Sequence, residues 1–400
     1  MENKEQIKEL NKLKSRITWM CRDKINAFSP TISPAPKSLE SQEIESIYEG
    51  FKYYVQRGVK DFVVQKKYMG SYCDIYLHKN IEQTYFVSRN GYKIEHIDLD
   101  EAYKACANLH QRFDWTDLEI VIIQSELLPW QILGKTLIER QYDSYLKAHQ
   151  LRLDFLASTD LLDKIGKVTN SAAFKAFALD RSTLSTEAFK ARYADHIIRQ
   201  YSSISAVPPI DIVKYKNGIL NFAKQLTHYG QPGQLYFKPF NILKKIFKDG
   251  REQIPNDNTS FKEVNDDEMK IVRIDSLDET REKTAEIYTW FQALTAQAEE
   301  GIMIKPKQCF IPGLPPALKV RNNQYLSLIY GIQFLDNLEQ LTTKRKIRKK
   351  LNCSIRQWQV NYRLVSTPYQ TIDGENYYFK NLLLDRILEE EIESQLDPSL

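Results

Sequence analysis

The chain of 400 residues is poor in the residue types that build several common functional sites. It contains five cysteines and six histidines, far apart in the sequence, with no CxxC, HExxH or HxH motif. This spacing argues against a disulfide-stabilised scaffold, a zinc ribbon and a histidine-based metal site. The sequence also lacks the P-loop motif GxxxxGK[ST] and has no GxGxxG motif after a predicted strand, so P-loop and Rossmann nucleotide binding are disfavoured.

Long apolar runs are absent as well. No segment approaches the ~18 consecutive apolar residues that indicate a membrane-spanning helix. The N-terminal sequence MENKEQIKELNKLKSR is too charged for a signal peptide, and its acidic residues are not typical of a transit peptide, so we expect a cytoplasmic protein. The 56 basic and 52 acidic residues give a formal net charge of +4, which alone does not indicate nucleic-acid binding.

Hydrophobic spacing divides the chain into strand-rich and helical blocks. The strand-rich blocks span 60–127 and 234–321. In the first block, an Asn90-Gly91 pair between two apolar runs predicts a β-hairpin with a strand on either side of the turn. Helical periodicity dominates 131–230 and the chain after about residue 324. Hairpins flanked by helices indicate an α+β fold rather than a doubly wound parallel sheet.

These blocks predict a domain organisation. The first part contains an amphipathic helix (2–19) and an extended linker, because prolines in the sequence FSPTISPAPKS interrupt the helical periodicity. The predicted parts are the N-terminal helix and linker (1–38), a discontinuous core (39–135 and 231–322), a helical insert (136–230) and a helical C-terminal module (323–400).

Four short elements carry candidate catalytic residues. In chain order they are Lys67-Tyr68-Met69-Gly70-Ser71 at a turn between strands, Ser88-Arg89-Asn90-Gly91 in the hairpin, Ser125-Glu126-Leu127 at the end of an apolar strand, and Glu300-Gly301-Ile302-Met303-Ile304-Lys305, followed by Lys319. Each element alone is typical of surface or half-buried residues. Their order and approximate spacing, however, match one known arrangement as a set.

The arrangement resembles that of the covalent nucleotidyltransferases, which include ATP-dependent polynucleotide ligases and mRNA capping enzymes. In that superfamily a KxDG nucleophile motif precedes an SRxG element, a strand ending in Glu, an EG strand ending in Lys, and a last strand with a catalytic lysine. A closer resemblance is to the ligase domain of bacterial polynucleotide kinase–phosphatase RNA-repair proteins, with their KxMGS, ELMPW-like and YLxxIYG sequences. The corresponding sequences here are KYMGS (67–71), ELLPW (126–130) and YLSLIYG (325–331), and the resemblance spans about 28–331.

The resemblance implies the fold and the reaction. The expected fold is an α+β nucleotidyltransferase core, an ATP-grasp-like ligase fold of antiparallel sheets with helices. Lys67 is expected to attack ATP and form lysyl-AMP, with the adjacent Lys66 as the competing candidate. Since lysine is protonated at neutral pH, this nucleophile needs burial or nearby positive charge. Lys305 and Lys319 are expected to stabilise the charge that develops on the phosphate.

The resemblance also implies how ATP and a divalent metal are bound. Glu300 is expected to associate with Mg²⁺ or Mn²⁺ and Glu126 to accept hydrogen bonds from the ribose, although these two roles could be exchanged. Arg89 is expected to bind the ribose or an RNA phosphate, and Phe240 in YFKPFNILKK to stack on adenine. Tyr72 departs from the superfamily pattern, which usually has a basic residue there in contact with the nucleotide sugar.

A basic segment lies in the predicted C-terminal module. It contains six basic residues within seven positions, and Trp358 and Tyr362 follow at helical spacing. The basic residues are Lys344, Arg345, Lys346, Arg348, Lys349 and Lys350. This segment could be an RNA phosphate track with stacking aromatics or a solvated helical face, and the sequence leaves both open.

The function expected from the resemblance is an ATP-dependent RNA ligase that acts in RNA repair. It would join an RNA 5′-phosphate to a 3′-OH, with ATP and Mg²⁺ or Mn²⁺. The expected partner is an end-processing kinase–phosphatase or an RNA methyltransferase, and the main alternative is an adenylylation-only subunit that needs such a partner to seal. A GTP-using capping-type enzyme and an inactive RNA-end binder are further alternatives. The capping-type enzyme is disfavoured by the MGS variant of the nucleophile motif and by the lack of a predicted barrel domain after the core.

Overall fold

The computed structural model describes residues 2–38, 40–41, 43–132, 141–207, 210–231, 233–260, 268–344 and 347–390. Internal contacts divide the chain into two units, which are described separately. The larger unit comprises Met1–Thr136 and Gln225–Leu400, and the smaller one comprises Leu137–Lys224. The smaller unit falls within the range 136–230 that the sequence marks as a helical insert, while the boundaries near residues 38 and 322 stay predictions.

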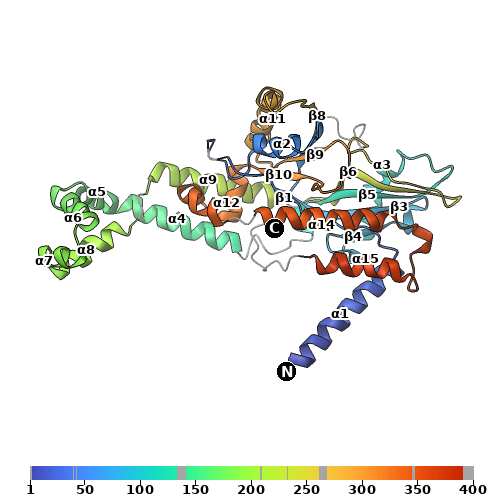
Figure 1. Cartoon of the computed structure of the whole chain (residues 1–400), viewed down its shortest axis with the longest axis horizontal. Coiled ribbons are helices and arrows are strands. Elements are labelled where there is room, and N and C mark those ends of the chain that lie inside the picture. The colour runs from blue at the N-terminus through green and yellow to red at the C-terminus, as the bar shows by residue number, and fades with distance from the viewer. Residues whose placement is uncertain are drawn as a thin grey trace. The chain divides into compact units, whose positions relative to one another are not determined.

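The larger unit is built on two five-stranded sheets (Figure 1). The first sheet has the order β1 (Ser33–Pro34), β10 (Leu318–Arg321), β9 (Gly301–Pro306), β2 (Asp61–Lys67) and β8 (Met269–Arg273). Its pairs are antiparallel except that β1 runs parallel to β10. The second sheet is antiparallel throughout, in the order β4 (Tyr85–Ser88), β3 (Ser71–His78), β5 (Leu118–Leu128), β6 (Tyr236–Phe247) and β7 (Glu252–Gln253).

Helices cover these sheets and connect their strands. The larger unit contains α1 (Glu2–Arg22), α2 (Ile47–Val55), α3 (Leu99–His110), α10 (Thr280–Lys283), α11 (Ala285–Ala296), α12 (Asn323–Tyr330), α13 (Leu338–Lys344), α14 (Ile347–Ser366) and α15 (Tyr377–Leu388). Among the described residues, no helix combines the length and the apolar composition that crossing a membrane requires. The prediction of an α+β fold with antiparallel sheets is confirmed.

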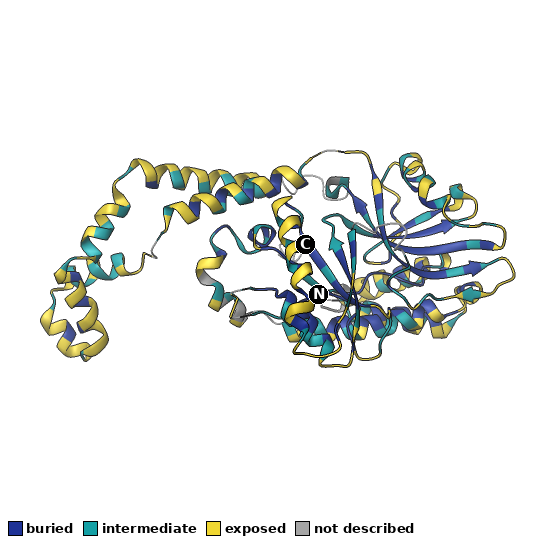
Figure 2. Ribbon diagram, turned by 90° about the horizontal axis from the view of Figure 1, so that it is seen from above, coloured by how far each residue is buried: buried dark blue, intermediate teal, exposed yellow. Residues whose placement is uncertain are grey.

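Side chains of the first sheet alternate between its two faces, because a strand has a period of two residues. Its buried face carries apolar side chains such as Phe62, Val64 and Ile302, which pack against α2 and α11. The opposite face carries polar and charged residues, and the candidate site lies there. Figure 2 shows the resulting pattern of buried strands beneath more exposed helices.

The second sheet is covered on both faces, so its strands contain apolar residues at odd and even positions alike. Cys73, Ile75 and Ile123 face a core shared with α3. Tyr76 and Ile122, on the other face, join a core formed with α14, α15 and the C-terminal end of α1. The C-terminal helices therefore complete the hydrophobic core of this sheet.

The predicted hairpin at Asn90-Gly91 is only half correct. β4 leads into the turn, but the following residues form one isolated bridge, between Val87 and Lys93, and no strand. Ile94 is buried after this bridge, and Asp98 then caps the N-terminus of α3. The polar residues between these two anchors are exposed, so the chain leaves the sheet before a second strand can form.

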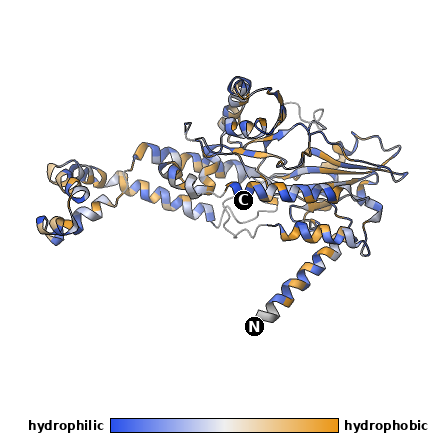
Figure 3. Ribbon diagram, viewed as in Figure 1, coloured by the Kyte–Doolittle hydropathy of each residue, from blue (hydrophilic) through white to orange (hydrophobic). Residues whose placement is uncertain are grey.

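The smaller unit consists of α4 (Asp143–Ser158), α5 (Leu161–Thr169), α6 (Ala172–Thr183), α7 (Thr186–Arg192) and α8 (Asp195–Ser205), with the first part of α9 (Ile212–Tyr229). Polar and apolar residues intermingle along these helices (Figure 3). Phe177 is buried at the centre of an aromatic cluster, and Asp180 accepts a 2.6 Å hydrogen bond from the hydroxyl of Tyr193.

Candidate active site

A cavity of about 430 Å³ takes residues from both sheets of the larger unit. Six predicted site residues line it: Lys67, Arg89, Glu126, Phe240, Lys305 and Lys319. The seventh, Glu300, contacts Lys67 directly. The structure thus brings together every residue that the sequence marks as a candidate for the site.

Strand register explains why the lysines share one face of the first sheet. Gly301 on β9 lies opposite Lys67 on β2, and Met303 lies opposite Lys319 on β10. Residues directly opposite each other, or two apart on one strand, point to the same face. Lys67, Lys319 and Lys305 therefore lie on the face away from the core, whereas Ile302 and Ile304 point into the core.

The side chain of Lys67 forms a close ion pair at one edge of the cavity. Its Nζ atom lies 2.7 Å from Oε2 of Glu300, a carboxylate that is only 2% exposed. Lys66 lies opposite Ile302, and its Nζ pairs instead with Glu299 at 2.8 Å. The two adjacent lysines therefore have different carboxylate partners, and only Lys67 is aligned with the other candidate lysines.

Burial lowers the pKa values of the two remaining lysines, Lys305 and Lys319. It lowers the pKa of Lys305 to about 8, and the ammonium lies 4.5 Å from the centre of the Phe240 ring. Burial also lowers the pKa of Lys319 well below its ordinary value, and the positive charges of Arg321 and Lys67 add to the effect. An anion bound in the cavity would offset both effects, because it favours the charged form of lysine.

Glu126 faces the same cavity from the second sheet. Burial raises its pKa to about 7, with a further contribution from Glu300 and an opposing one from Lys67. Its Oε1 atom accepts a 3.1 Å hydrogen bond from the backbone N–H of Gly70. The chain approaches closely here, because a Cβ on Gly70 would lie 2.5 Å from the carbonyl oxygen of Leu127.

The carboxylates of the site suit a divalent metal. Burial is the main cause of the raised pKa of Glu126, and the negative charge of Glu300 adds to it, so the two carboxylates repel each other. Mg²⁺ in nucleotide enzymes is usually held by one or two carboxylates together with substrate phosphates, and a cation would relieve this repulsion. The described residues contain no group of three or more side chains that could hold a metal without a substrate.

Tyr72 does not replace the basic residue that is usual at its position. Its hydroxyl donates to Asp74 at 2.6 Å and accepts from Gln124 at 2.7 Å. Gln124 in turn accepts from Asn241 at 3.1 Å. Three members of this network are buried, and the half-buried fourth, Tyr72, packs its ring against that of Phe240. No motif in the sequence points to this hydrogen-bond network, although the alternation in SYCDIY puts Tyr72 and Asp74 on one face of the strand.

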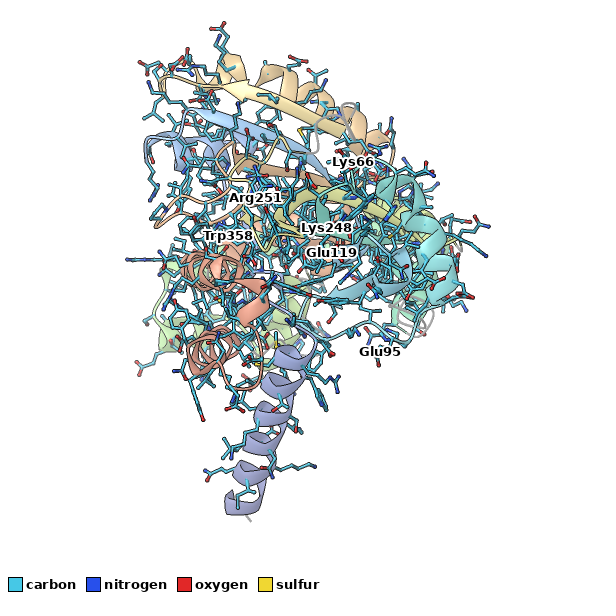
Figure 4. All side chains as sticks on the ribbon, turned by 90° about the vertical axis from the view of Figure 1, so that its right-hand side faces the viewer. Lys66, Glu95, Glu119, Lys248, Arg251 and Trp358 are labelled. Carbon is cyan, nitrogen blue, oxygen red and sulfur yellow. The ribbon has the colours of Figure 1, made fainter. Side chains whose placement is uncertain are left out.

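The C-terminal helices also contribute to the cavity, which the sequence does not indicate. Lys350 and Trp358 of α14 both line the cavity. Trp358, labelled in Figure 4, is 6% exposed, and its indole N–H donates to the carbonyl of Cys309 at 3.2 Å. Trp358 is therefore a mostly buried residue at the cavity wall, and whether the basic segment binds RNA stays a prediction. Tyr362 stacks on Phe310. Arg345, Lys346 and the side chain of Lys344 lie outside the described residues.

Two largely antiparallel sheets that share a cavity lined by lysines and carboxylates fit a nucleotidyltransferase fold. The family comparison makes this assignment specific. The chain belongs to the family described as the PNKP adenylyltransferase domain, ligase domain, whose model matches residues 15–367. The prediction of an ATP-using adenylyltransferase of the ligase type is confirmed.

Two solved structures are similar over nearly the whole chain. One, described as the structure of the Pnkp1/Rnl/Hen1 complex, is 48% identical, has a TM-score of 0.88, and covers 98% of this chain and 99% of its own. The other, described as the structure of the Pnkp1/Rnl/Hen1 RNA repair complex, is also 48% identical, with a TM-score of 0.90 and coverages of 96% and 97%. A search of curated proteins finds no match.

Proposed function

We propose that the chain is an ATP-dependent RNA ligase that acts in RNA repair through a lysyl-AMP intermediate on Lys67. The observation that carries this proposal is the position of Lys67, which lies 2.7 Å from Glu300 and shares one cavity with Lys305 and Lys319. The similarity at 48% identity to a chain of an RNA repair complex supports RNA as the substrate.

In the first step, Lys67 takes up AMP. Its ammonium must lose a proton before it can attack, and the carboxylate of Glu300 is the acceptor within hydrogen-bond distance. The amine then forms an N–P bond to the α-phosphorus of ATP while the bond to the β-phosphate breaks and pyrophosphate leaves. Lys305 and Lys319 stabilise the negative charge on the phosphate oxygens.

In the later steps, AMP passes to RNA and the strand is joined. An oxygen of the RNA 5′-phosphate attacks the AMP phosphorus, so the N–P bond breaks and Lys67 is regenerated. A 3′-OH then attacks the activated 5′-phosphate, and AMP leaves. Arg89, at the cavity wall, binds the ribose or the RNA phosphate through its planar guanidinium.

Different residues bind the adenine base, the ribose and the metal ion. Phe240 stacks on adenine and Glu126 accepts from the ribose hydroxyls. Glu300 associates with Mg²⁺ or Mn²⁺, which supplies additional positive charge at the phosphates. The backbone carbonyl of Phe240 accepts from the side-chain amide of Gln65 at 3.2 Å, which fixes this strand relative to β2.

The proposal includes partners and a location. The similar chains belong to assemblies with Pnkp1 and Hen1, so we infer that this chain joins an end-processing kinase–phosphatase and an RNA methyltransferase. We also infer a cytoplasmic location. Its support is that the five cysteines are free thiols, all buried, as is typical of a reducing compartment.

Labelling with each α-³²P-labelled NTP, in the presence of Mg²⁺ or Mn²⁺, tests the first step. We expect covalent label from ATP that is lost in Lys67→Ala and retained in Lys66→Ala. Exclusive labelling by GTP, or label that survives in Lys67→Ala, would contradict the proposal.

Addition of nicked RNA, and separately of nicked DNA, tests the later steps. We expect joined RNA from the protein alone. Transfer of AMP to the RNA end without joining would instead favour an adenylylation-only subunit that seals only with its partner. In that case, adding the kinase–phosphatase or the methyltransferase should restore joining.

A further inference from the structure

Helix α14 contributes to the wall of the cavity, although it follows all the catalytic motifs in the sequence. Lys350, in its first turns, lines the cavity together with Lys319 of β10. The neighbouring Lys349 belongs to the same basic segment but is exposed and does not line the cavity. The two adjacent lysines of α14 therefore have different surroundings.

Hydrogen bonds from three side chains of α14 join the helix to residues 28–31 and to Cys309. The side chain of Gln357 accepts from the backbone N–H of Thr31 at 2.6 Å, and that of Asn361 donates to the carbonyl of Phe28 at 2.6 Å. The third bond joins Trp358 to the carbonyl of Cys309 at 3.2 Å. All three of these helical residues are buried, so the contacts that position Lys350 at the cavity are buried contacts rather than solvent-exposed ones.

Some of the lysines that line the cavity form no ion pair with a carboxylate among the described residues. Lys66 and Lys67 each pair with a glutamate. By contrast, no described carboxylate forms an ion pair with Lys305, Lys319 or Lys350. The ammonium groups of Lys319 and Lys350 are also close enough that the second lowers the pKa of the first. Two neighbouring ammonium groups of this kind repel each other, and a bound anion with several charges would relieve the repulsion.

We propose that Lys350, together with Lys319, binds the β- and γ-phosphates of ATP, which become the pyrophosphate leaving group. The inference rests on the proposed function, which puts the α-phosphorus at Lys67 and the adenine at Phe240. The rest of the triphosphate must then extend away from the base. Lys67, Lys319 and Lys350 all line the same cavity, so positively charged side chains are available for it there.

The chemistry favours pyrophosphate over the RNA 5′-phosphate as the ligand of Lys350. When Lys67 attacks, the breaking P–O bond moves negative charge onto the β-phosphate, where positive charge lowers the barrier. Lysine is a compact point charge that suits such a phosphate chain. The C-terminal helical module would thus complete the site for adenylylation.

The test compares Lys350→Ala with the matched control Lys349→Ala in two reactions. The first is lysyl-AMP formation from labelled ATP, and the second is the joining of RNA that already carries 5′-linked AMP, a reaction that involves no pyrophosphate. We expect Lys350→Ala to slow the first reaction about tenfold or more, as for loss of a charged hydrogen bond, and to leave the second within about twofold. Lys349→Ala should match the wild type in the first reaction, which involves no RNA, and Lys350→Arg should retain part of the rate of that reaction.

Pyrophosphate itself provides a second readout. Added pyrophosphate reverses the first step, and this reversal should need a higher concentration in Lys350→Ala than in the wild type. The inference is overturned if Lys350→Ala shows wild-type rates of labelling and of its reversal. It is also overturned if Lys350→Ala slows lysyl-AMP formation and RNA joining equally, or slows RNA joining alone. Absence of label in the wild type would instead refute the proposed function.

Discussion

The buried ion pair between Arg321 and Glu45 supports the strand that carries Lys319. The backbone N–H of Arg321 donates to Glu45 at 2.9 Å, and the guanidinium adds bonds of 3.2 Å and 2.5 Å. Both side chains are almost fully buried, so neither charge has water as a substitute partner. The substitution Glu45→Gln removes one charge and leaves the shape of the site nearly unchanged.

The expected loss of stability is large. Removing one partner of a buried pair typically costs about 3–5 kcal/mol, because the other charge stays buried without compensation. That cost is a substantial fraction of the roughly 5–15 kcal/mol that stabilises a typical folded domain. Replacing both residues, as in Glu45→Leu with Arg321→Met, should restore at least half of the loss, because no uncompensated charge then remains.

Urea unfolding followed by circular dichroism measures this effect through the transition midpoint. Asp275→Asn, which removes an exposed partner of Arg273, is the control and should leave the midpoint nearly unchanged. The reasoning is refuted if Glu45→Gln unfolds within about 1 kcal/mol of the wild type. It is refuted equally if the double variant is less stable than the single one.

The same substitution changes the pH dependence of adenylylation. Glu45 raises the pKa of Lys319, whereas Arg321 lowers it. Without Glu45 the pKa of Lys319 falls further, so Lys319 loses its charge at a lower pH as the pH rises. The alkaline limb of lysyl-AMP formation should therefore shift to lower pH in Glu45→Gln, and an unchanged profile would show that the charge of Lys319 does not limit the reaction.

Three further predictions concern the cavity and its surroundings. Gly70→Ala should reduce lysyl-AMP formation about tenfold or more, measured by labelling, because the new Cβ would lie 2.5 Å from the carbonyl oxygen of Leu127. Asp74→Asn should flatten the pH dependence of unfolding. Burial raises the pKa of Asp74 from 3.8 to about 7, so the wild type binds more protons when folded and loses stability as pH rises through that window. Phe240→Leu should raise the ATP concentration for half-maximal labelling about tenfold, as expected for a lost stacking contact, and should also weaken the binding of adenylylated RNA, which carries the same adenine.

Local patterns in the sequence predict much of the fold and the position of the candidate lysines. Alternation along a strand is a property of neighbouring residues, so it places Met303 and Lys305 on one face before any partner strand is known. The order of the motifs, together with the resemblance they carry, then predicts that Lys67 and Lys319 meet. The roles of these residues stay predictions until labelling is measured.

Features that depend on distant contacts could not be read from local patterns. The chain after Gly91 has strand-forming residues, yet the burial of Ile94 and the cap of α3 take it out of the sheet. Trp358 follows the basic segment at helical spacing, which does not show what surrounds it, and its side chain packs in a core built from N-terminal and C-terminal segments. The position of Lys350 at the cavity likewise depends on α14 docking against residues 28–31, which no periodicity reveals.

The contact between Gln357 and Thr31 can form only after both residues have been synthesised, which limits how early the cavity can be completed. These residues are 326 positions apart in the chain. A ribosome that adds roughly 5–20 residues per second makes the second of them about 16–65 s after the first. Until then the cavity lacks the wall that α14 provides, although Lys67 has already been made. A nascent chain would thus acquire its complete cavity only after α14 has been synthesised.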